Sequence, residues 1–368
     1  MSDPVTEADQ VEGTPHPRET RTLFGQDAAE RDFLSAWRGG KLHHAWLITG
    51  PRGVGKATLA WRIARFLLSR DAGEARAEET LDVAWDHPAA RRLRALSEPG
   101  LFLLRRPRDE KTGKLRQVIT IEEARELRRY LTLSRTDGGR RVVLIDAADD
   151  LNTASSNAIL KLLEEPPART TLLLVCHAPA RLLPTIRSRC RTLRCLPLGG
   201  GDMAAALEGA GLSPDAAPAA LAELASGSVG MAARLIDADG PALYGALADL
   251  LRGAPGMDRP RLLRFAETAG GPTNAAGFDT VSGLIGLALS RLARNGAGHP
   301  PDAEAAPGEA EMLLRLSPDI AAARRWASLQ QELGARMAHG RAVNLDPSSL
   351  ILDTMLAIDE TAAGLVPA

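Results

Sequence analysis

The chain has 368 residues, too many for one ordinary hydrophobic core, so its length predicts two or three domains. Its apolar fraction of 45% and charged fraction of 25% are typical of a globular protein, and its net charge of −1 excludes a global electrostatic attraction to nucleic acid. The three cysteines include no Cys-x-x-Cys pair, which argues against a disulfide framework and against a thiolate zinc site.

The first 20 residues are polar, acidic and proline-containing, with nothing to bury and no apolar core like that of a signal peptide. We therefore expect residues 1–20 to form a disordered leader. No apolar run in the chain approaches the roughly 20 residues that a membrane-spanning helix needs. The sequence predicts a reduced, cytoplasmic protein that makes no membrane contact.

A helical pattern with apolar positions at Phe33 and Trp37 precedes a short buried strand at 43–48. The strand opens with two adjacent histidines, His43 and His44. Neighbouring residues of a strand point to opposite faces, so this pair favours packing or hydrogen bonding over metal binding.

A glycine-rich loop follows that strand and opens the next helix, expected at 59–69. Gly50, Gly53 and Gly55 let the backbone curl so that its N–H groups face an anion, and the helix N-terminus adds positive potential. Lys56 would reach the terminal phosphates of a nucleotide. The pattern predicts a phosphate-binding loop.

One position departs from that pattern. The residue after the lysine should be Ser or Thr, whose hydroxyl coordinates magnesium, but Ala57 stands there and Thr58 lies one position late. Whether the loop still binds a nucleotide is left open by the sequence, and hydrolysis is not favoured.

Residues 70–117 are charged and irregular apart from an apolar run at 101–104, which predicts a strand. A basic cluster follows this run. Because few aromatic residues are interleaved to stack bases, a solvated face is the simpler interpretation, and a nucleic-acid patch is the alternative. The cluster comprises Arg105, Arg106, Arg108, Lys111, Lys114 and Arg116.

Two short aliphatic runs, Val142–Ile145 and Thr171–Val175, flank a helix-patterned segment. Strands covered on both faces form continuous aliphatic runs, so the pattern predicts two buried parallel strands joined by a crossover helix. The first run ends on Asp146, where a nucleotide-binding sheet would hold a metal-directed carboxylate. The second leads to Arg189, at the end of a polar, proline-broken segment that we expect on the surface.

The C-terminal half is predicted to be helical. Three consecutive glycines at 199–201 predict a hinge, and three short helical patterns follow through Asp237. Residues 241–368 contain no strand-like run, and the stretch 296–307 predicts a flexible break. The helices expected in this half lie near 242–251, 259–269, 278–294, 310–336 and 347–363.

Three motifs carry a resemblance: Leu-Leu-Glu-Glu-Pro-Pro at 162–167, Ser-Arg-Cys at 188–190 and Arg-Ala-Val-Asn-Leu-Asp-Pro at 341–347. With the loop at 50–58, they resemble the AAA+ clamp-loader ATPases of bacterial DNA polymerase III, most closely the delta-prime members of that family. The resemblance covers about residues 20–240 well and the remainder more loosely.

The resemblance implies an α/β plus all-α protein. Its parts would be an AAA+ P-loop NTPase-like parallel sheet, a small helical lid and a C-terminal helical collar that serves oligomerisation. The corresponding domains are 21–198, 199–240 and 241–368.

An ATP-hydrolysing member of this family needs an Asp that holds magnesium and a following Glu that polarises the attacking water. Asp146 is present, but a Glu does not follow it. The polar sensor position and the lid arginine of Gly-Ser-x-Arg are also replaced, and the sequence does not decide which of two residues occupies the sensor position. The four departures are Ala57, Ala147, Gly230 and the Cys176–His177 pair. Together they argue against intrinsic ATPase activity.

The cofactor expectations follow from the same comparison. Many members of the family carry a four-cysteine zinc module between the phosphate loop and the acidic strand. No cysteine occurs in that interval here, so we expect no zinc and no other metal. No cofactor would be required, although residual ATP or ADP binding stays open. The degenerate nucleotide-binding set comprises Gly50, Gly53, Gly55, Lys56, Thr58 and Asp146.

Arg189 is different, because in this family the Ser-Arg-Cys arginine projects into the ATP site of the adjacent motor subunit. A guanidinium delivered in trans neutralises charge developing on the γ-phosphate, with effects of roughly 10³–10⁵-fold in well-studied cases. The alternative is a plain surface arginine, since Arg187, Arg191 and Arg194 crowd the same stretch. The position within the triplet favours the arginine finger.

The resemblance therefore implies a stator-like subunit of the clamp loader within the DNA polymerase III holoenzyme, a nucleotidyltransferase complex. Its partners would be tau/gamma motor subunits and a delta subunit in a hetero-pentamer, the sliding clamp, and primed DNA through the complex. Two alternatives stay open. One is an ATP-hydrolysing tau/gamma-type motor, and the other is a scaffold with a decayed nucleotide fold and no trans-acting arginine.

Overall fold

The computed structural model of the chain describes residues 7–70, 78–109, 111–132, 138–270 and 275–365. The chain forms two compact units. The first contains the residues up to 198 together with 205–212 and 228–230. The second contains 199–204, 213–227 and the residues from 231 onward.

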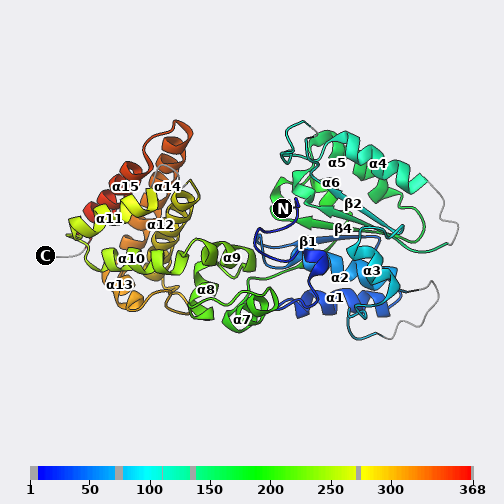
Figure 1. The fold of residues 1–368 in the computed structure, drawn as a ribbon, viewed down its shortest axis with the longest axis horizontal. Coiled ribbons are helices and arrows are strands. Elements are labelled where there is room, and N and C mark those ends of the chain that lie inside the picture. The colour runs from blue at the N-terminus through cyan, green and yellow to red at the C-terminus, as the bar shows by residue number, and fades with distance from the viewer. Residues whose placement is uncertain (1–6, 71–77, 110, 133–137, 271–274, 366–368) are drawn as a thin grey trace, which may run out of the picture. The chain divides into compact units, whose positions relative to one another are not determined.

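The first unit is built around a parallel sheet of five strands (Figure 1). They are β1 (Ala45–Thr49), β2 (Leu101–Arg105), β3 (Arg141–Asp146), β4 (Thr170–Cys176) and β5 (Arg191–Arg194). Their order in the sheet is β2-β3-β4-β1-β5, and β1, β3 and β4 are buried at every position. Burial on both faces is why the central residues of these strands are mostly aliphatic, and the parallel pair predicted around Asp146 is confirmed.

Helices cover both faces of this sheet (Figure 1). They are α1 (Asp27–Arg38), α2 (Lys56–Leu68), α3 (Pro88–Arg94), α4 (Ile121–Thr132), α5 (Thr153–Glu164) and α6 (Pro184–Arg187). On one face, Phe33 of α1 packs against Trp46 of β1, with ring centroids 5.0 Å apart. The three-layer arrangement is the α/β part of the predicted fold class.

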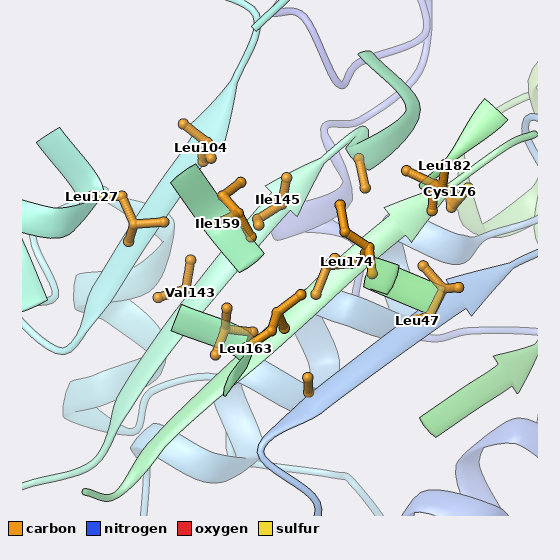
Figure 2. Packing of buried hydrophobic residues seen from close by; sticks show 14 of the residues in the cluster. Leu47, Leu104, Leu127, Val143, Ile145, Ile159, Leu163, Leu174, Cys176 and Leu182 are labelled. Atoms are coloured by element: carbon orange, nitrogen blue, oxygen red, sulfur yellow. The ribbon is translucent and has the colours of Figure 1, made fainter. Parts of the chain in front are cut away.

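The opposite face of the sheet carries a leucine- and isoleucine-rich core (Figure 2). Leu127 of α4 and Ile159 and Leu163 of α5 lie over Val143 and Leu174, and all of these side chains are 0 or 1% exposed. Each buried aliphatic side chain of this size contributes about 1.5–3 kcal/mol relative to exposure. This core fixes the end of α5, where Glu164 lies.

The N-terminal segment differs from the disordered leader expected for 1–20. Residues 1–6 lie outside the described residues, but His16 is 4% exposed and packs edge-on against Trp61. Arg18 donates a hydrogen bond to the carbonyl oxygen of Arg94. Charge pairs and hydrogen bonds hold residues 7–20, and a low content of apolar residues does not reveal such contacts.

The second unit is helical, which is the all-α part of the predicted class. No strand occurs in the described residues beyond 241. Its helices include α8 (Pro218–Leu224), α10 (Gly240–Arg252), α11 (Arg259–Gly270), α12 (Ala275–Gly296), α13 (Glu309–Leu316), α14 (Ile320–Ala342) and α15 (Pro347–Ala363). Among the helices that the structure describes, none alone is long and apolar enough to cross a membrane, whereas the bent pair formed by α8 and α9 (Val229–Asp237) meets that criterion together.

The residues expected to form a separate lid, 199–240, divide between the two units. The chain from α7 (Gly200–Gly209) to α9 contributes 205–212 and 228–230 to the first unit and the remainder to the second. The expected hinge at 199–201 largely lies within the first turn of α7. The division into three domains stays a prediction.

The single helix predicted at 310–336 is wrong. The chain forms α13 and then α14, with a break at Ser317–Asp319. Pro318 cannot continue the first helix, because its ring clashes with the preceding turn and it has no N–H to donate. Asp319 caps the second helix by accepting a hydrogen bond from the N–H of Ala322 at 2.9 Å.

A buried ion-pair network lies in the second unit. Arg291 of α12 is 2% exposed and Glu309 of α13 is 0% exposed, and Arg291 Nε lies 2.7 Å from Glu309 Oε1. The hydroxyl of Tyr244 donates to the same carboxylate oxygen at 2.5 Å. The N–H of Ala305 donates to Glu309 Oε2 at 2.6 Å, so the stretch predicted as a flexible break at 296–307 is anchored near its end.

Candidate functional site

The predicted phosphate-binding loop lies between β1 and α2. Gly50, Gly53 and Gly55 adopt φ values of +144°, +75° and +98°, which side-chain-bearing residues rarely adopt. A Cβ at Gly50 would lie 2.4 Å from the carbonyl oxygen of Cys195, and one at Gly53 would lie 2.3 Å from Ser228 Oγ. The curled backbone predicted from the glycine spacing is therefore present.

Lys56 is the first residue of α2 and is 3% exposed. Its Nζ donates to the carbonyl oxygen of Gly50 at 2.8 Å and also to that of Pro51. Burial lowers the pKa of Lys56 to about 8. The ammonium group is thus folded back onto its own loop, where two carbonyl oxygens take its hydrogen bonds.

The residues that would hold magnesium are poorly suited to that task. Ala57 offers no hydroxyl, and Thr58, the third residue of α2, is half-buried one position further on. Asp146 ends β3 at 7% exposure, and burial, followed by the charge of Asp9, raises its pKa to about 8. A carboxyl group that is largely protonated at neutral pH is a weak ligand for a hard cation.

The next positions supply no replacement for the missing glutamate. Ala147 follows Asp146 and is 3% exposed. Asp149 is buried at 6% exposure, and its Oδ1 accepts a hydrogen bond from the backbone N–H of His177 at 2.9 Å. This carboxylate is therefore engaged in fixing the chain after β4.

The sequence leaves the sensor position open between Cys176 and His177. Cys176 is the last residue of β4 and is fully buried, and burial raises the pKa of its thiol to about 12. His177 lies just beyond the strand, and burial lowers the pKa of its imidazole, which favours the neutral ring. Neither side chain carries a charge toward the loop at neutral pH.

The N-terminal segment and the start of α9 both lie against the loop. The N–H of Gly230 donates to the carbonyl oxygen of Gly53 at 3.3 Å. The side chain of Val11 lies on Gly230, so close that a Cβ there would be 3.0 Å from Val11 Cγ2. Gly230, which replaces the lid arginine, thus permits close backbone packing on the loop. As folded, these residues do not fit a magnesium nucleotide.

A charged cluster formed by Glu7, Asp9 and His16 joins the N-terminal segment to β2, and the sequence did not predict it. The Asp9 side chain is 0% exposed, and Arg105 Nη1 lies 2.5 Å from Asp9 Oδ1 and from Glu7 Oε2. His16 Nε2 lies 3.2 Å from Asp9 Oδ1. These three potential ligands lie within 4.8 Å of one another, as in a metal site, but Arg105 already compensates the carboxylates.

The structure therefore corrects the prediction of a solvated face for Arg105, a member of the basic cluster at 105–116. The sequence groups it with solvated residues, but it bridges two acidic side chains of the N-terminal segment. Arg106 pairs with Asp150 at 3.1 Å. The positive charges that remain for the two interpretations of this cluster are those of the exposed residues Arg108, Lys111, Lys114 and Arg116.

Arg189 follows α6 and begins the approach to β5. Its Nη2 lies 2.8 Å from Oε1 of Glu164, the last residue of α5, and its Nη1 donates to the carbonyl oxygen of Thr185 at 3.0 Å. The Arg189 side chain is 35% exposed. The sequence places Glu164 in a motif but does not reveal this partner.

The loop and Arg189 lie at opposite ends of β1. The loop leaves the carboxyl end of the strand after Thr49, whereas Arg189 precedes Arg191, which pairs with Trp46 near the beginning of the strand. Five residues of a strand span about 17 Å. The structure therefore does not bring Arg189 together with Lys56 and Asp146 of the same chain.

Residues 25–198 match the family model described as "DNA polymerase III, delta subunit". This match covers just under half of the chain. The DNA polymerase III subunit delta' of Pseudomonas aeruginosa is 40% identical over 182 residues, 49% of this chain and 51% of the relative. That of Escherichia coli K12 is 30% identical over 165 residues, 43% of this chain and 44% of the relative. The chain thus spans about half the length of these curated relatives.

Two further similarities concern other proteins. The DNA polymerase III subunit gamma/tau of Mycobacterium tuberculosis H37Rv is 29% identical over 180 residues, 47% of this chain and 28% of the relative. Among solved structures, a DNA polymerase III gamma subunit-related protein from Thermotoga maritima is 15% identical with a TM-score of 0.37, over 90% of this chain and 100% of that one.

Proposed function

We propose that this chain is a delta-prime-type subunit of a bacterial DNA polymerase III clamp loader and that it supplies Arg189 in trans to the ATP site of a neighbouring motor subunit. The proposal extends to the whole chain what the similarity supports for residues 25–198. Its partners would be tau/gamma motor subunits, a delta subunit, the sliding clamp, and primed DNA through the complex. The α/β unit would be the AAA+ domain and the C-terminal helices the collar, working in the cytoplasm.

The observation that carries the proposal is the separation of the two sites along β1. Lys56 donates its hydrogen bonds to the backbone of its own phosphate loop, at one end of β1. Arg189 is partly exposed at the other end of that strand. An arginine there cannot serve the loop of its own chain but is available to a nucleotide bound by another chain. This supports a subunit that assists hydrolysis without performing it.

The chemistry of such a contact is electrostatic. During phosphoryl transfer, charge develops on the γ-phosphate oxygens, and a guanidinium placed beside them stabilises the transition state. Arginine suits this role because it stays protonated and presents a planar fork of N–H groups that matches phosphate oxygens. Lysine at the same position would offer a single ammonium group.

The test is reconstitution with motor and delta subunits. Arg189→Ala should lower the turnover of the ATP site it faces by about 10³-fold, and DNA-stimulated ATPase and clamp loading by the complex should fall. Arg189→Lys should recover only part of the loss. The exposed neighbour Arg187→Ala is the matched control. Wild-type clamp loading by the Arg189→Ala complex would refute the arginine finger.

The second candidate is an ATP-hydrolysing motor, which the similarity to gamma/tau subunits favours. It predicts ATP turnover by the purified chain alone that Lys56→Ala abolishes. The proposed function predicts none. The scaffold without a trans-acting arginine is separated from both by the Arg189→Ala reconstitution.

A further inference from the structure

Glu164 and Arg189 join two motifs that the sequence presents separately. Glu164 ends α5 and begins the Glu-Glu-Pro-Pro run, while Arg189 is the centre of the Ser-Arg-Cys triplet. Glu164 Oε1 and Arg189 Nη2 lie 2.8 Å apart, and α5 and α6 pack together. The pair is partly exposed, with side-chain exposures of 49% for Glu164 and 35% for Arg189.

The backbone that carries Glu164 is rigidly held. The preceding residue, Leu163, is 1% exposed in the core of the sheet, and its carbonyl oxygen accepts a hydrogen bond from His44 Nε2 at 2.9 Å. Pro166 and Pro167 prevent the helix from continuing. Glu164 is therefore a fixed point on which a long, flexible arginine side chain can be oriented.

Arg189 is also held from its own turn. Its Nη1 donates to the carbonyl oxygen of Thr185 at 3.0 Å, so two different N–H groups are fixed by two different segments. A guanidinium has five N–H donors. Three of them are not needed for these two contacts, and Arg189 can bind phosphate oxygens without leaving Glu164.

The positive charges around Arg189 make a nearby carboxylate stabilising. Arg187, Arg191 and Arg194 are exposed on the same short stretch and repel its guanidinium. Without Glu164 the side chain would be free to rotate away from these charges, and orienting it for each reaction would cost rotamer entropy. Glu164 both offsets the local positive charge and restricts the rotamers.

We propose that Glu164 is a positioning residue that presents Arg189 to the phosphates of the neighbouring subunit's ATP. The proposal rests on the proposed function, because it deepens the role given there to Arg189. The two glutamates of the Glu-Glu-Pro-Pro motif then have different roles. Glu164 orients the arginine, and Glu165 does not.

The experiment compares Glu164→Ala, Glu164→Gln and Glu165→Ala in the reconstituted clamp loader. Glu165→Ala is the matched control, since it removes an exposed carboxylate from the same helix end. Glu164→Ala should lower the kcat of the ATP site that Arg189 faces by about two- to fivefold, the size expected for an exposed pair, without changing KM for ATP, complex assembly or Tm. Glu164→Gln keeps the accepting oxygen and should recover part of the activity.

A double-variant cycle separates positioning from a general structural effect. In an Arg189→Ala background, Glu164→Ala should have no further effect on kcat. An equal further loss there would overturn the positioning role, and so would a gain in kcat in the single variant, which would mean that Glu164 withholds the arginine. If Arg189→Ala itself leaves activity unchanged, the proposed function fails. If Arg189→Ala impairs activity while Glu164→Ala does not, only this inference fails.

Discussion

Lys56 Nζ donates a hydrogen bond to the carbonyl oxygen of Gly50 at 2.8 Å, and thus to the loop that would present it to a phosphate. In a working phosphate loop the lysine is a point charge for the terminal phosphates. Here its donors are occupied by carbonyl oxygens of its own loop, and its pKa is lowered by burial. A nucleotide would have to displace these contacts without a magnesium ligand at Ala57.

This arrangement predicts that the purified chain does not bind nucleotide specifically. Titration with a fluorescent ADP or ATP analogue should show no saturable binding up to about 1 mM, which corresponds to a binding free energy weaker than about −4 kcal/mol. Lys56→Ala should leave that titration unchanged. Saturable binding that Lys56→Ala removes would show that the loop opens in solution.

The cluster around Arg105 gives a second prediction. Arg105→Ala leaves the buried carboxylate of Asp9 without the guanidinium that lies 2.5 Å from it, so unfolding of the first unit should become easier by about 1–3 kcal/mol. Residues 7–18 should also exchange their amide hydrogens faster. Arg116→Ala, in the same basic stretch but 47% exposed, should change stability by less than about 0.5 kcal/mol. Unchanged exchange in Arg105→Ala would contradict the bridging role.

The pH dependence of this contact follows from its carboxylates. Although burial opposes it, hydrogen bonds and charges from His16 and Arg105 lower the pKa of Asp9 below its ordinary value. A lowered pKa stabilises the fold at pH values above the unfolded pKa, near 4, and this contribution is lost as the pH falls through the folded value. The Arg105→Ala effect should therefore be larger at pH 7 than at pH 3.

Much of the fold was predictable because its signals are local. Continuous aliphatic runs identified β3 and β4, and glycine spacing identified the loop, since each depends on a few neighbouring residues. The limits of α15 were also correct, because Asp346 and Pro347 begin a helix by themselves. Pro318 also marks the break between α13 and α14 in the sequence. The apolar pattern continues on both sides of it, however, and this pattern predicts a single helix.

The missed contacts share a different cause. Asp9 and Arg105, like Glu164 and Arg189, meet only because the folded sheet brings distant segments together. A charged residue in a sequence looks the same whether it is solvated or paired, and no periodicity reveals its partner. The motifs therefore locate the candidate site in the sequence. They do not predict that Lys56 bonds to its own loop or that Arg189 pairs with Glu164.

Asp146 gives a third prediction. The unfolded carboxyl loses its proton near pH 4, whereas burial raises the folded pKa to about 8. The charged groups that influence it are Lys56, Asp9, Asp149 and Asp150. Its contribution to stability is therefore complete below about pH 4 and is lost as the pH rises through 8.

Asp146→Asn cannot titrate, so relative to the wild type it should gain about 3–4 kcal/mol of unfolding free energy between pH 5 and pH 8. Denaturant unfolding followed by tryptophan fluorescence measures this, because most tryptophans of the chain lie in the first unit. The exposed residue Asp27→Asn is the control. Parallel pH profiles for wild type and Asp146→Asn would show that the carboxyl is ionised in the fold.

The fourth prediction concerns the second unit, whose stability depends on Glu309 being neutralised. Arg291→Met removes the cation that lies 2.7 Å from this fully buried carboxylate, and the cost should be about 3–5 kcal/mol. Tyr244→Phe removes one hydrogen bond to the same oxygen and should cost about 1–2 kcal/mol. Arg294→Met, exposed on the same helix, should be nearly neutral.

A double variant tests whether the loss comes from the unpaired charge or from the missing packing. Replacing Arg291 and Glu309 together by Met and Leu removes both charges, so much of the stability lost in Arg291→Met should return. The measurement is thermal unfolding followed by circular dichroism, because this unit is helical. A double variant as unstable as Arg291→Met would mean that the network acts mainly by holding the segment before α13, through the N–H of Ala305, against Glu309.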